Sequence, residues 1–412
     1  MTDKIVKTST RTKRIEVIDA LRGVSLIGIC LIHATQHFGV ASIQAHQPFF
    51  AWEGTSDGIL QWLIANLVAG KFYIIFSCLF GLSFFIQMDR ASRKGVDFRP
   101  RFIWRLMLLL LFGYLLGLIF RIEILLIYAL VGLVLVLVYK WSTRVLVAIV
   151  LFLFLGGVPL VYLSIGTLLS PSPVKMEQVE MASSSAPSSS VRHEIPRTSV
   201  ASSPTLSQTI RDNAWNGLSR KMNYQFSSGR IYLTLGLFIL GLVIGRIRLF
   251  ERLSEFRSNL IRMAVGAFVF VVLLSIAEMY IPSVAHSEIS INSWMRTTAG
   301  NVKNLCVSYL WVIAVVEAYR STRIRRLAAP IVSYGRMGLT NYVTQSLLGV
   351  FIFAGFGLDL GRLGVTLSVC AGLTYTILQI MFSHRWLRTF RYGPLEWLWR
   401  SGTYMKWQPL KR

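Results

Sequence analysis

The chain has 412 residues, of which 54% are hydrophobic and only 15% are charged. This composition excludes an ordinary soluble domain and indicates a membrane protein. The net charge of +24 would suggest nucleic-acid binding in a soluble protein. Here the Lys and Arg residues gather between long apolar stretches, which is the pattern that orients a protein in a bilayer, so we expect no nucleic-acid partner.

The first apolar stretch, residues 17–40, follows a basic segment at residues 1–13. A cleaved signal peptide would show the same order of basic and apolar residues. However, Asp19 and Arg22 interrupt the start of the apolar stretch and no small-residue cleavage pattern follows it, which favours an uncleaved span with a cytoplasmic N-terminus. Asp19 and Arg22 are three residues apart, so they share a helical face and are expected to pair.

His33 lies in the same stretch, eleven residues after Arg22. Eleven residues are almost three helical turns, so both side chains lie on one face, about 16 Å apart along the axis. An ionisable residue at membrane depth indicates a functional site, and the alternative is a packed or hydrogen-bonded membrane histidine. His33 and His37 are spaced i, i+4, which is compatible with one metal ion. The zincin sequence is absent and no third ligand is compelling, so we expect no metal.

Nine more apolar stretches follow, and loops rich in basic residues alternate with loops that have few. Under the positive-inside rule the basic loops are cytoplasmic. We therefore predict an all-α polytopic membrane helix bundle of about ten transmembrane helices, surrounded by the lipid bilayer and with both termini cytoplasmic. The spans are predicted at residues 17–40, 70–88, 102–120, 124–139, 145–165, 230–247, 261–281, 302–319, 328–355 and 362–382.

Glycines predict a helix break next to one of these spans and a close helix contact in another. The apolar residues 58–88 would form a helix of about 46 Å, which exceeds the bilayer core of about 30 Å, so we expect a break at Gly70. Gly241 and Gly245 form a small-xxx-small pair in the sixth span. Such a pair is expected to let another helix approach closely.

Composition divides the chain into four segments. Residues 1–165 form an N-terminal membrane half, and residues 230–384 form a C-terminal membrane half. Between them, residues 166–229 are predicted to form an external loop whose Ser/Pro-rich part cannot bury a core and is disordered. A short amphipathic helix at residues 206–226 is expected on the outer surface. Residues 385–412 form a Trp-rich tail that is predicted to be cytoplasmic.

Two acidic residues near the predicted external face have alternative interpretations. Glu123 either pairs with Arg121 in a tight turn or belongs to an acceptor site beside Tyr128. Glu278, in the outer turn of the seventh span, is either an interfacial acid or a partner for His33.

The ninth span carries Arg336, Asn341 and Gln345 within an apolar helix. Asn341 and Gln345 are i, i+4 neighbours and face one way. They either make interhelical hydrogen bonds or contribute to a substrate site.

Several segments carry a resemblance to known families. DALRG, followed by an apolar run and a His eleven residues after the Arg, resembles the first helix of the transmembrane acyl transferase superfamily. GRMGLTNYVTQS and GPLEWLWRSGTY resemble signatures of the YeiB-like family of bacterial multi-pass membrane proteins, whose domain has no assigned function, and KFYIIFSCLFGLSF and IEILLIYALVG resemble its internal segments. The resemblance covers nearly the whole chain except the Ser-rich insert. Many YeiB-like members have Asn where this chain has His33.

The resemblance implies transfer of an acyl group from cytoplasmic acyl-CoA to an acceptor on the far side of the bacterial inner membrane, with His33 as the catalytic residue. We expect acetyl as the acyl group and an exported or envelope small molecule, glycan or lipid as the acceptor. A neutral imidazole can act as general base or acyl relay. Arg22 and Arg336 would bind donor phosphates, and Asp19 would orient Arg22. The predicted substrate-binding set also contains Glu123, Tyr128, Asn341 and Gln345.

A transporter or flippase without covalent chemistry is the rival prediction. Ten spans with buried polar residues suit a transporter as well as an enzyme. The sequence contains no clear inverted repeat or pair of broken helices, which counts against transport.

Overall fold

The computed structural model describes residues 15–39, 55–169, 204–278, 280, 291–360 and 363–412, and their regular structure is helical. The helices are α1 (Glu16–Thr35), α2 (Thr55–Leu63), α3 (Lys71–Ser92), α4 (Arg99–Gly117), α5 (Leu125–Val138), α6 (Thr143–Phe154), α7 (Gly157–Leu169), α9 (Leu206–Asp212), α10 (Leu218–Ser227), α11 (Arg230–Arg246), α12 (Leu253–Glu278), α13 (Ile291–Ala318), α14 (Thr322–Leu327), α15 (Ala329–Arg336), α16 (Gly338–Phe353), α17 (Val365–Thr389) and α18 (Pro394–Tyr404). Short turns of other helical type lie at His37–Gly39, Ile64–Val68 and Asn213–Gly217.

Six of the described helical segments are long and apolar enough to cross a bilayer. They are Glu16–Thr35, Asp57–Ser92, Arg99–Gly117, Leu253–Glu278, Trp294–Ala318 and Val365–Thr389. A seventh candidate is the pair Leu206–Ser227 and Arg230–Arg246, which is bent by 74°. The remaining predicted spans fall on shorter or broken helices. The protein is thus an all-α helix bundle of multi-pass membrane type.

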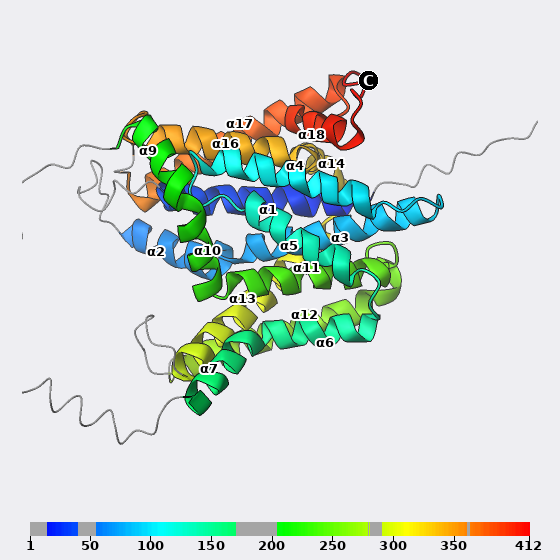
Figure 1. The fold of residues 1–412 in the computed structure, drawn as a ribbon, viewed down its shortest axis with the longest axis vertical. Helices are drawn as coiled ribbons and strands as arrows, with labels where there is room; N and C mark the ends of the chain where they lie inside the picture. The colour runs from blue at the N-terminus through cyan, green and yellow to red at the C-terminus, as the bar shows by residue number, and fades with distance from the viewer. Residues whose placement is uncertain (1–14, 40–54, 170–203, 279, 281–290, 361–362) are drawn as a thin grey trace, which may run out of the picture.

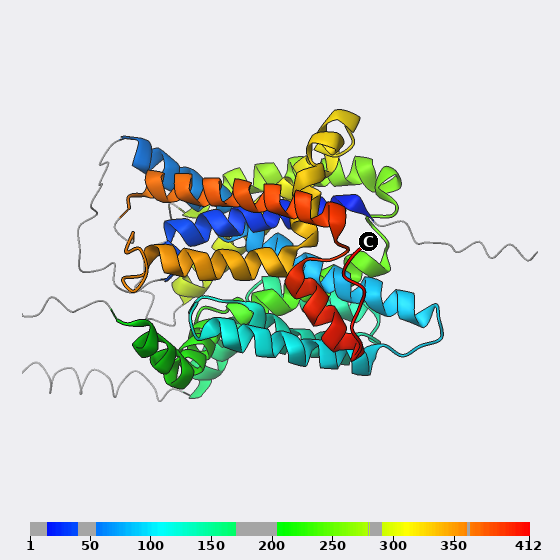
Figure 2. The ribbon, with the colours of Figure 1, turned by 90° about the horizontal axis from the view of Figure 1, so that it is seen from above.

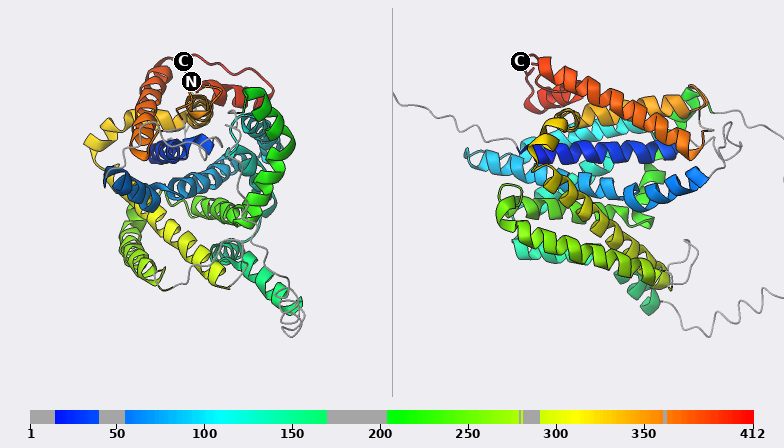
Figure 3. Two further views of the ribbon diagram at one scale, coloured as in Figure 1. Left: turned by 90° about the vertical axis from the view of Figure 1, so that its left-hand side faces the viewer. Right: turned by 180° about the vertical axis from the view of Figure 1, so that it is seen from behind.

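The long helices run side by side, and α1 lies inside the bundle (Figures 1 and 3). It packs against α3, α15, α16 and α17. Figure 2 shows that α1 begins at the end of the bundle where α18 lies and ends where α9 and α10 lie. We call these the α18 end and the α10 end. The predicted disordered insert, except for its last residues, falls outside the described residues.

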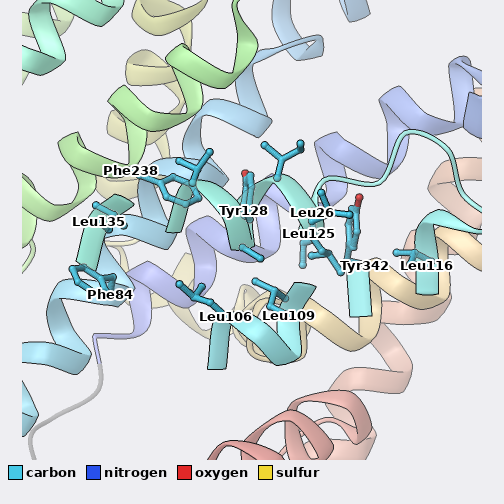
Figure 4. Close-up of a cluster of buried hydrophobic side chains, with 14 of the residues drawn as sticks. Leu26, Phe84, Leu106, Leu109, Leu116, Leu125, Tyr128, Leu135, Phe238 and Tyr342 are labelled. Atoms are coloured by element: carbon cyan, nitrogen blue, oxygen red, sulfur yellow. The ribbon is translucent and has the colours of Figure 1, made fainter. Parts of the chain in front are cut away.

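The core joins helices from both halves of the sequence. Figure 4 shows Leu26 of α1, Leu106 of α4, Leu135 of α5 and Phe238 of α11 within one buried cluster. At the edge of the bundle, by contrast, α12 packs on α13 and contains no buried residue (Figure 3). Its apolar surface suits contact with lipid.

Glycines set the distance between α3 and α11. A Cβ added at Gly81 would overlap the carbonyl oxygen of Phe238, and one at Gly241 would overlap that of Cys78. Gly245 faces the ring of Phe85 in the same way. The predicted role of Gly241 and Gly245 in close helix approach is therefore confirmed, with α3 as the partner helix.

Helix breaks confirm one prediction about the spans and correct two others. The break predicted at Gly70 is confirmed, since this residue has φ +79° and precedes α3. The prediction of one helix at residues 145–165 is wrong, because Gly156, at φ +68°, separates α6 from α7. The prediction of one helix at residues 328–355 is also wrong, because α15 ends before Met337 and α16 begins after it.

The C-terminal segment explains this last break. Glu396 of α18 accepts hydrogen bonds from the Leu339 amide at 2.6 Å, the Thr340 amide at 3.0 Å and the Thr340 hydroxyl at 2.6 Å. The carboxylate therefore caps the start of α16, where amides lack partners within their own helix. Burial raises the pKa of Glu396, and these hydrogen bonds oppose the shift. Trp399 anchors α18 to α4 by donating to the Arg105 carbonyl at 3.0 Å.

Replacing Gly241 by alanine tests the close contact between α3 and α11. We expect Gly241→Ala to lower the melting temperature of the purified protein in detergent, because the new Cβ would overlap backbone atoms. Overpacking of this kind typically costs about 1–3 kcal/mol. Gly266→Ala in α12 is the matched control, since nothing lies within 4 Å of the place that its new Cβ would occupy. Equal melting temperatures for the two variants would contradict the close contact.

Candidate functional site

A cavity of about 1490 Å³ follows α1 from Ile15 to Gln36. Its walls come mainly from α1, α3, α4, α5, α10 and α11, with residues of α15 and α16 on one side. Arginines and a few acids line the cavity toward the α18 end, and aromatic, polar and basic residues line it toward the α10 end. A large concave site with a few converging polar groups is the usual location of a ligand site.

Arg22 and Asp19 lie on the cavity wall toward the α18 end. Arg22 donates from Nη1 to the Asp19 carboxylate at 2.9 Å and from Nη2 to the Ser83 hydroxyl of α3 at 2.5 Å. The pairing expected from the sequence spacing is present. Ser83 is a partner that the sequence did not reveal. These contacts hold the guanidinium at the wall of the cavity.

Further arginines surround Arg22 at this end. The cavity wall contains Arg90, Arg93, Arg105, Arg248 and Arg336, and the acids on it at this end are Asp19, Asp89, Glu251 and Glu396. Arg336 reaches this region because the neighbouring Gly335 packs directly on the backbone of Asp19. Asp89 pairs with Arg93 at 3.0 Å and lies 3.6 Å from Arg248. The excess of guanidinium groups makes this end suitable for a phosphate-bearing molecule.

His33 lines the cavity toward the α10 end. Its ring lies edge-on to Phe120, with 5.2 Å between centroids, and is 5.7 Å from Phe38 and 6.3 Å from Tyr342. Nδ1 is buried and has no hydrogen-bond partner among the described residues, whereas the residue as a whole is only partly buried. The imidazole is thus held by aromatic packing and remains accessible from the cavity.

Tyr128 and Glu123 also line the cavity. The Tyr128 hydroxyl lies 2.6 Å from that of Ser77. Glu123 is buried, forms an ion pair with Lys221 of α10 and accepts from the Leu126 amide at 3.2 Å. The prediction that Glu123 pairs with Arg121 is therefore wrong. Burial raises the pKa of Glu123, and the Lys221 ammonium opposes the shift.

Residues of the turn Asn213–Gly217 and of α10 line the cavity at this end, where the sequence predicted only a helix on the outer surface. Asn213 donates to the Leu118 carbonyl at 3.0 Å, which fixes this turn to the end of α4. Lys221, Tyr224 and Gln225 line the cavity from α10. Sequence reasoning missed these residues. Their signal was weak, a single Lys and two polar residues on an amphipathic helix.

Asn341 and Gln345 do not line the cavity. Asn341 donates to the Tyr334 carbonyl at 2.9 Å and to the Ser383 hydroxyl of α17 at 3.0 Å. Gln345 is buried and accepts from the Tyr334 hydroxyl at 3.4 Å. Their hydrogen bonds join α15, α16 and α17, as the interhelical alternative predicted.

The structure also shows the neighbours of His37 and Glu278, two residues that the sequence placed near His33. His37 lies 3.0 Å from the Leu363 carbonyl and 3.2 Å from the Ser368 hydroxyl, on the side of α17 rather than on the cavity wall. Glu278 pairs with Lys303 of α13. The alternative in which Glu278 is a partner for His33 is therefore wrong, and His33 has aromatic neighbours instead.

The ion pair between Glu123 and Lys221 is open to a double-mutant test. Glu123→Gln would leave a Lys221 side chain that is only 10% exposed without its counter-charge. We expect a loss of about 3–5 kcal/mol in unfolding free energy. The double change Glu123→Gln with Lys221→Met should cost less than the single one.

The exposed pair of Asp212 and Arg220 provides the control. Asp212→Asn should cost less than about 1 kcal/mol, because exposed ion pairs contribute little. Thermal unfolding in detergent measures all three variants. A double variant that is less stable than Glu123→Gln would contradict a buried pair.

The chain is similar to known proteins along nearly its whole length. Residues 244–406 match a family model described as "Protein of unknown function (DUF418)". Uncharacterized protein YxaH of Bacillus subtilis is 30% identical over 97% of this chain and 96% of its own. Uncharacterized protein YeiB of Escherichia coli is 27% identical over 94% of this chain and 95% of its own. An uncharacterized 39.9 kDa protein of Bacillus acidopullulyticus is 25% identical over 97% and 96%. The chain therefore belongs to the YeiB-like family of DUF418 proteins, whose function is unknown.

Proposed function

We propose that this protein is a transmembrane acyltransferase that moves an acyl group, with acetyl as the expected one, from cytoplasmic acyl-CoA to an exported or envelope acceptor. The observation that carries the proposal is that Arg22 and His33 line one cavity although they lie near opposite ends of α1. A charged donor bound at the basic end would thus share a continuous space with an imidazole at the other end. The acceptor would be a small molecule, a glycan or a lipid.

The α18 end supports binding of the donor. Arg22 is held in place by Asp19 and Ser83, so its guanidinium is ordered before a ligand arrives. Arg336 lies nearby on the same wall. Charge-assisted hydrogen bonds from arginine to phosphate are strong. A guanidinium group that is already held in place loses less conformational entropy on binding than a mobile one.

The α10 end would hold the reaction. The acceptor hydroxyl or amine attacks the thioester carbonyl while His33 takes its proton as general base. The new bond to the acyl carbon forms, the bond from carbon to sulfur breaks, and the proton passes to the leaving coenzyme A thiolate. The products are the acylated acceptor and free coenzyme A.

The membrane arrangement follows from the same proposal. We propose ten spans, with both termini and the α18 end on the cytoplasmic side of a bacterial inner membrane. The shorter helices α5 and α6 and the broken pair α15 and α16 would complete the ten spans. The arginines of the α18 end then meet cytoplasmic acyl-CoA, as the positive-inside rule favours.

A transporter or flippase is the second candidate. The observation in its favour is the extent of the cavity wall along α1, from Ile15 to Gln36. A path of this kind would also suit a solute that crosses without covalent change. Imidazole chemistry distinguishes the two, since a carrier needs only the polarity of His33.

Cysteine labelling tests the topology. In a background without the four native cysteines, Ser219→Cys of α10 should react with a membrane-impermeant maleimide in intact cells. Ser254→Cys at the start of α12 should react only after lysis. Both serines are exposed, so neither result is limited by burial. The opposite pattern, or protection of both sites in intact cells, would rule out the proposed orientation.

Substitution of His33 and Arg22 tests the chemistry. With labelled acetyl-CoA and membranes containing the protein, His33→Ala and His33→Asn should both abolish label transfer. Arg22→Ala should raise the KM for acetyl-CoA by about 10–100-fold, the equivalent of about 1.5–3 kcal/mol for a hydrogen bond to a charged group.

His384→Asn and Arg252→Ala are the matched controls. His384 contacts Ser333 and Arg388, and Arg252 pairs with Glu255, all away from the cavity wall. Both variants should transfer label normally. Full activity of His33→Asn would exclude imidazole chemistry and favour the transporter.

A further inference from the structure

Arg230, the first residue of α11, lines the cavity at the α10 end together with His33. Its guanidinium lies over the Tyr73 ring, with 4.8 Å between Cζ and the ring centroid. Its Nη1 donates to the Tyr224 hydroxyl at 3.2 Å. Both partners are neutral.

The charge of Arg230 has no carboxylate partner within the described part of the chain. Glu123 is the acid on the cavity wall at this end, and it is paired with Lys221. Arg230 is only partly exposed. A cation withdrawn from water is costly unless an anion or several hydrogen bonds compensate it. An anionic ligand group in the cavity would supply that compensation.

Three more polar atoms at this end are buried without a hydrogen-bond partner among the described residues: Asn213 Oδ1, Gln225 Oε1 and His33 Nδ1. All three residues line the cavity. The Asn213 amide nitrogen donates to Leu118, which leaves its oxygen as an acceptor. Amide oxygens accept hydrogen bonds from hydroxyl and amino groups. Buried polar atoms in this state call for an explanation, and a ligand with such donors provides one.

We propose that the α10 end binds an acidic acceptor. Its carboxylate or phosphate group pairs with Arg230, and its hydroxyl or amino groups donate to Asn213 and Gln225. This inference rests on the proposed acyl transfer, because it specifies the acceptor that His33 deprotonates. Inorganic cations and neutral apolar molecules do not fit, since a guanidinium repels the first and unpaired amides disfavour the second.

The position of Arg230 also suits the reaction. Arg230 and His33 both line the cavity at the α10 end, so the two groups share one region. When His33 takes a proton it becomes a second cation on the same cavity wall, and like charges repel each other. An acceptor anion on Arg230 would offset this repulsion. Acceptors without the anion would therefore react more slowly as well as bind more weakly.

Matched sugars test the proposal on the full-length protein in lipid nanodiscs. Glucose is the neutral probe, glucuronate carries a carboxylate and glucose 6-phosphate carries a phosphate on the same ring. Binding is followed by equilibrium dialysis of labelled sugar, in the absence of acetyl-CoA. We expect at least one acidic sugar to bind about ten-fold or more tightly than glucose, as a charge-assisted hydrogen bond requires. The acidic sugar that binds identifies the preferred anion.

Arg230→Gln should remove this preference, while Arg230→Lys should retain part of it. Arg211→Gln is the control, because Arg211 is an exposed arginine of the neighbouring helix α9 that does not line the cavity. Equal binding of the three sugars to the unmodified protein would overturn the inference, and this comparison holds even if Arg230→Gln does not fold. Undiminished preference in Arg230→Gln would overturn it too.

Binding of coenzyme A shows whether the anion that pairs with Arg230 belongs to the donor or to the acceptor. If Arg230→Gln weakens coenzyme A binding and leaves sugar binding unchanged, the anion at Arg230 belongs to the donor and the inference is wrong. Transfer of label to glucose as readily as to the acidic sugars would also overturn the inference and leave acyl transfer standing. Arg230-dependent binding of an acidic sugar without any label transfer would support the site and count against the enzyme.

Discussion

Packing of charged groups around α1 is the constraint on which the rest of the bundle depends. A carboxylate and a guanidinium inside a membrane protein need partners and a wet surface. Asp19 and Ser83 supply the partners of Arg22. Contact between Gly335 and the backbone of Asp19 holds α15 against α1. The cavity beside α1 is the wet surface, and its arginines are gathered there by this close packing.

The opposite end of the cavity is organised by a helix rather than by a loop. The segment α9–α10 lies across the bundle at 74° to α11, and the pair of Glu123 and Lys221 fixes it. Because Glu123 is buried, the pair is shielded from solvent and salt. Polar atoms of this segment therefore face the space beside His33 instead of water. Electrostatic interactions with a bound ligand are stronger where protein rather than water surrounds the charges.

Local features of the sequence were sufficient to predict the pairing of Asp19 with Arg22, the break at Gly70 and the role of Gly241. The pairing depends on helical spacing, the break on the thickness of a bilayer, and the contact on side-chain size. Lys221, by contrast, is separated by 98 residues from Glu123. Such a contact depends on how the helices pack, and no local periodicity records it.

The same limit explains why the sequence did not predict the partners of the two polar residues of α16. It also explains why the break between α15 and α16 was not predicted. The spacing of Asn341 and Gln345 indicated that they share a face, but which neighbour that face meets depends on the fold. It meets Tyr334 and α17. The break before α16 is fixed by Glu396 from the C-terminal segment, so it has no signal within the span itself.

The separation of the two ends of the cavity constrains the donor. Arg22 and His33 are about 16 Å apart along α1, as eleven helical residues require. An acyl phosphate, in which the phosphate adjoins the reactive carbonyl, would not reach both. A donor with a neutral arm between its phosphates and its thioester would. The cavity wall between the two residues carries Ile29, Phe76 and Phe80, which suit such an arm. The proposed acyl transfer requires one donor to contact both Arg22 and His33, and acyl-CoA carries such an arm between its phosphates and its thioester.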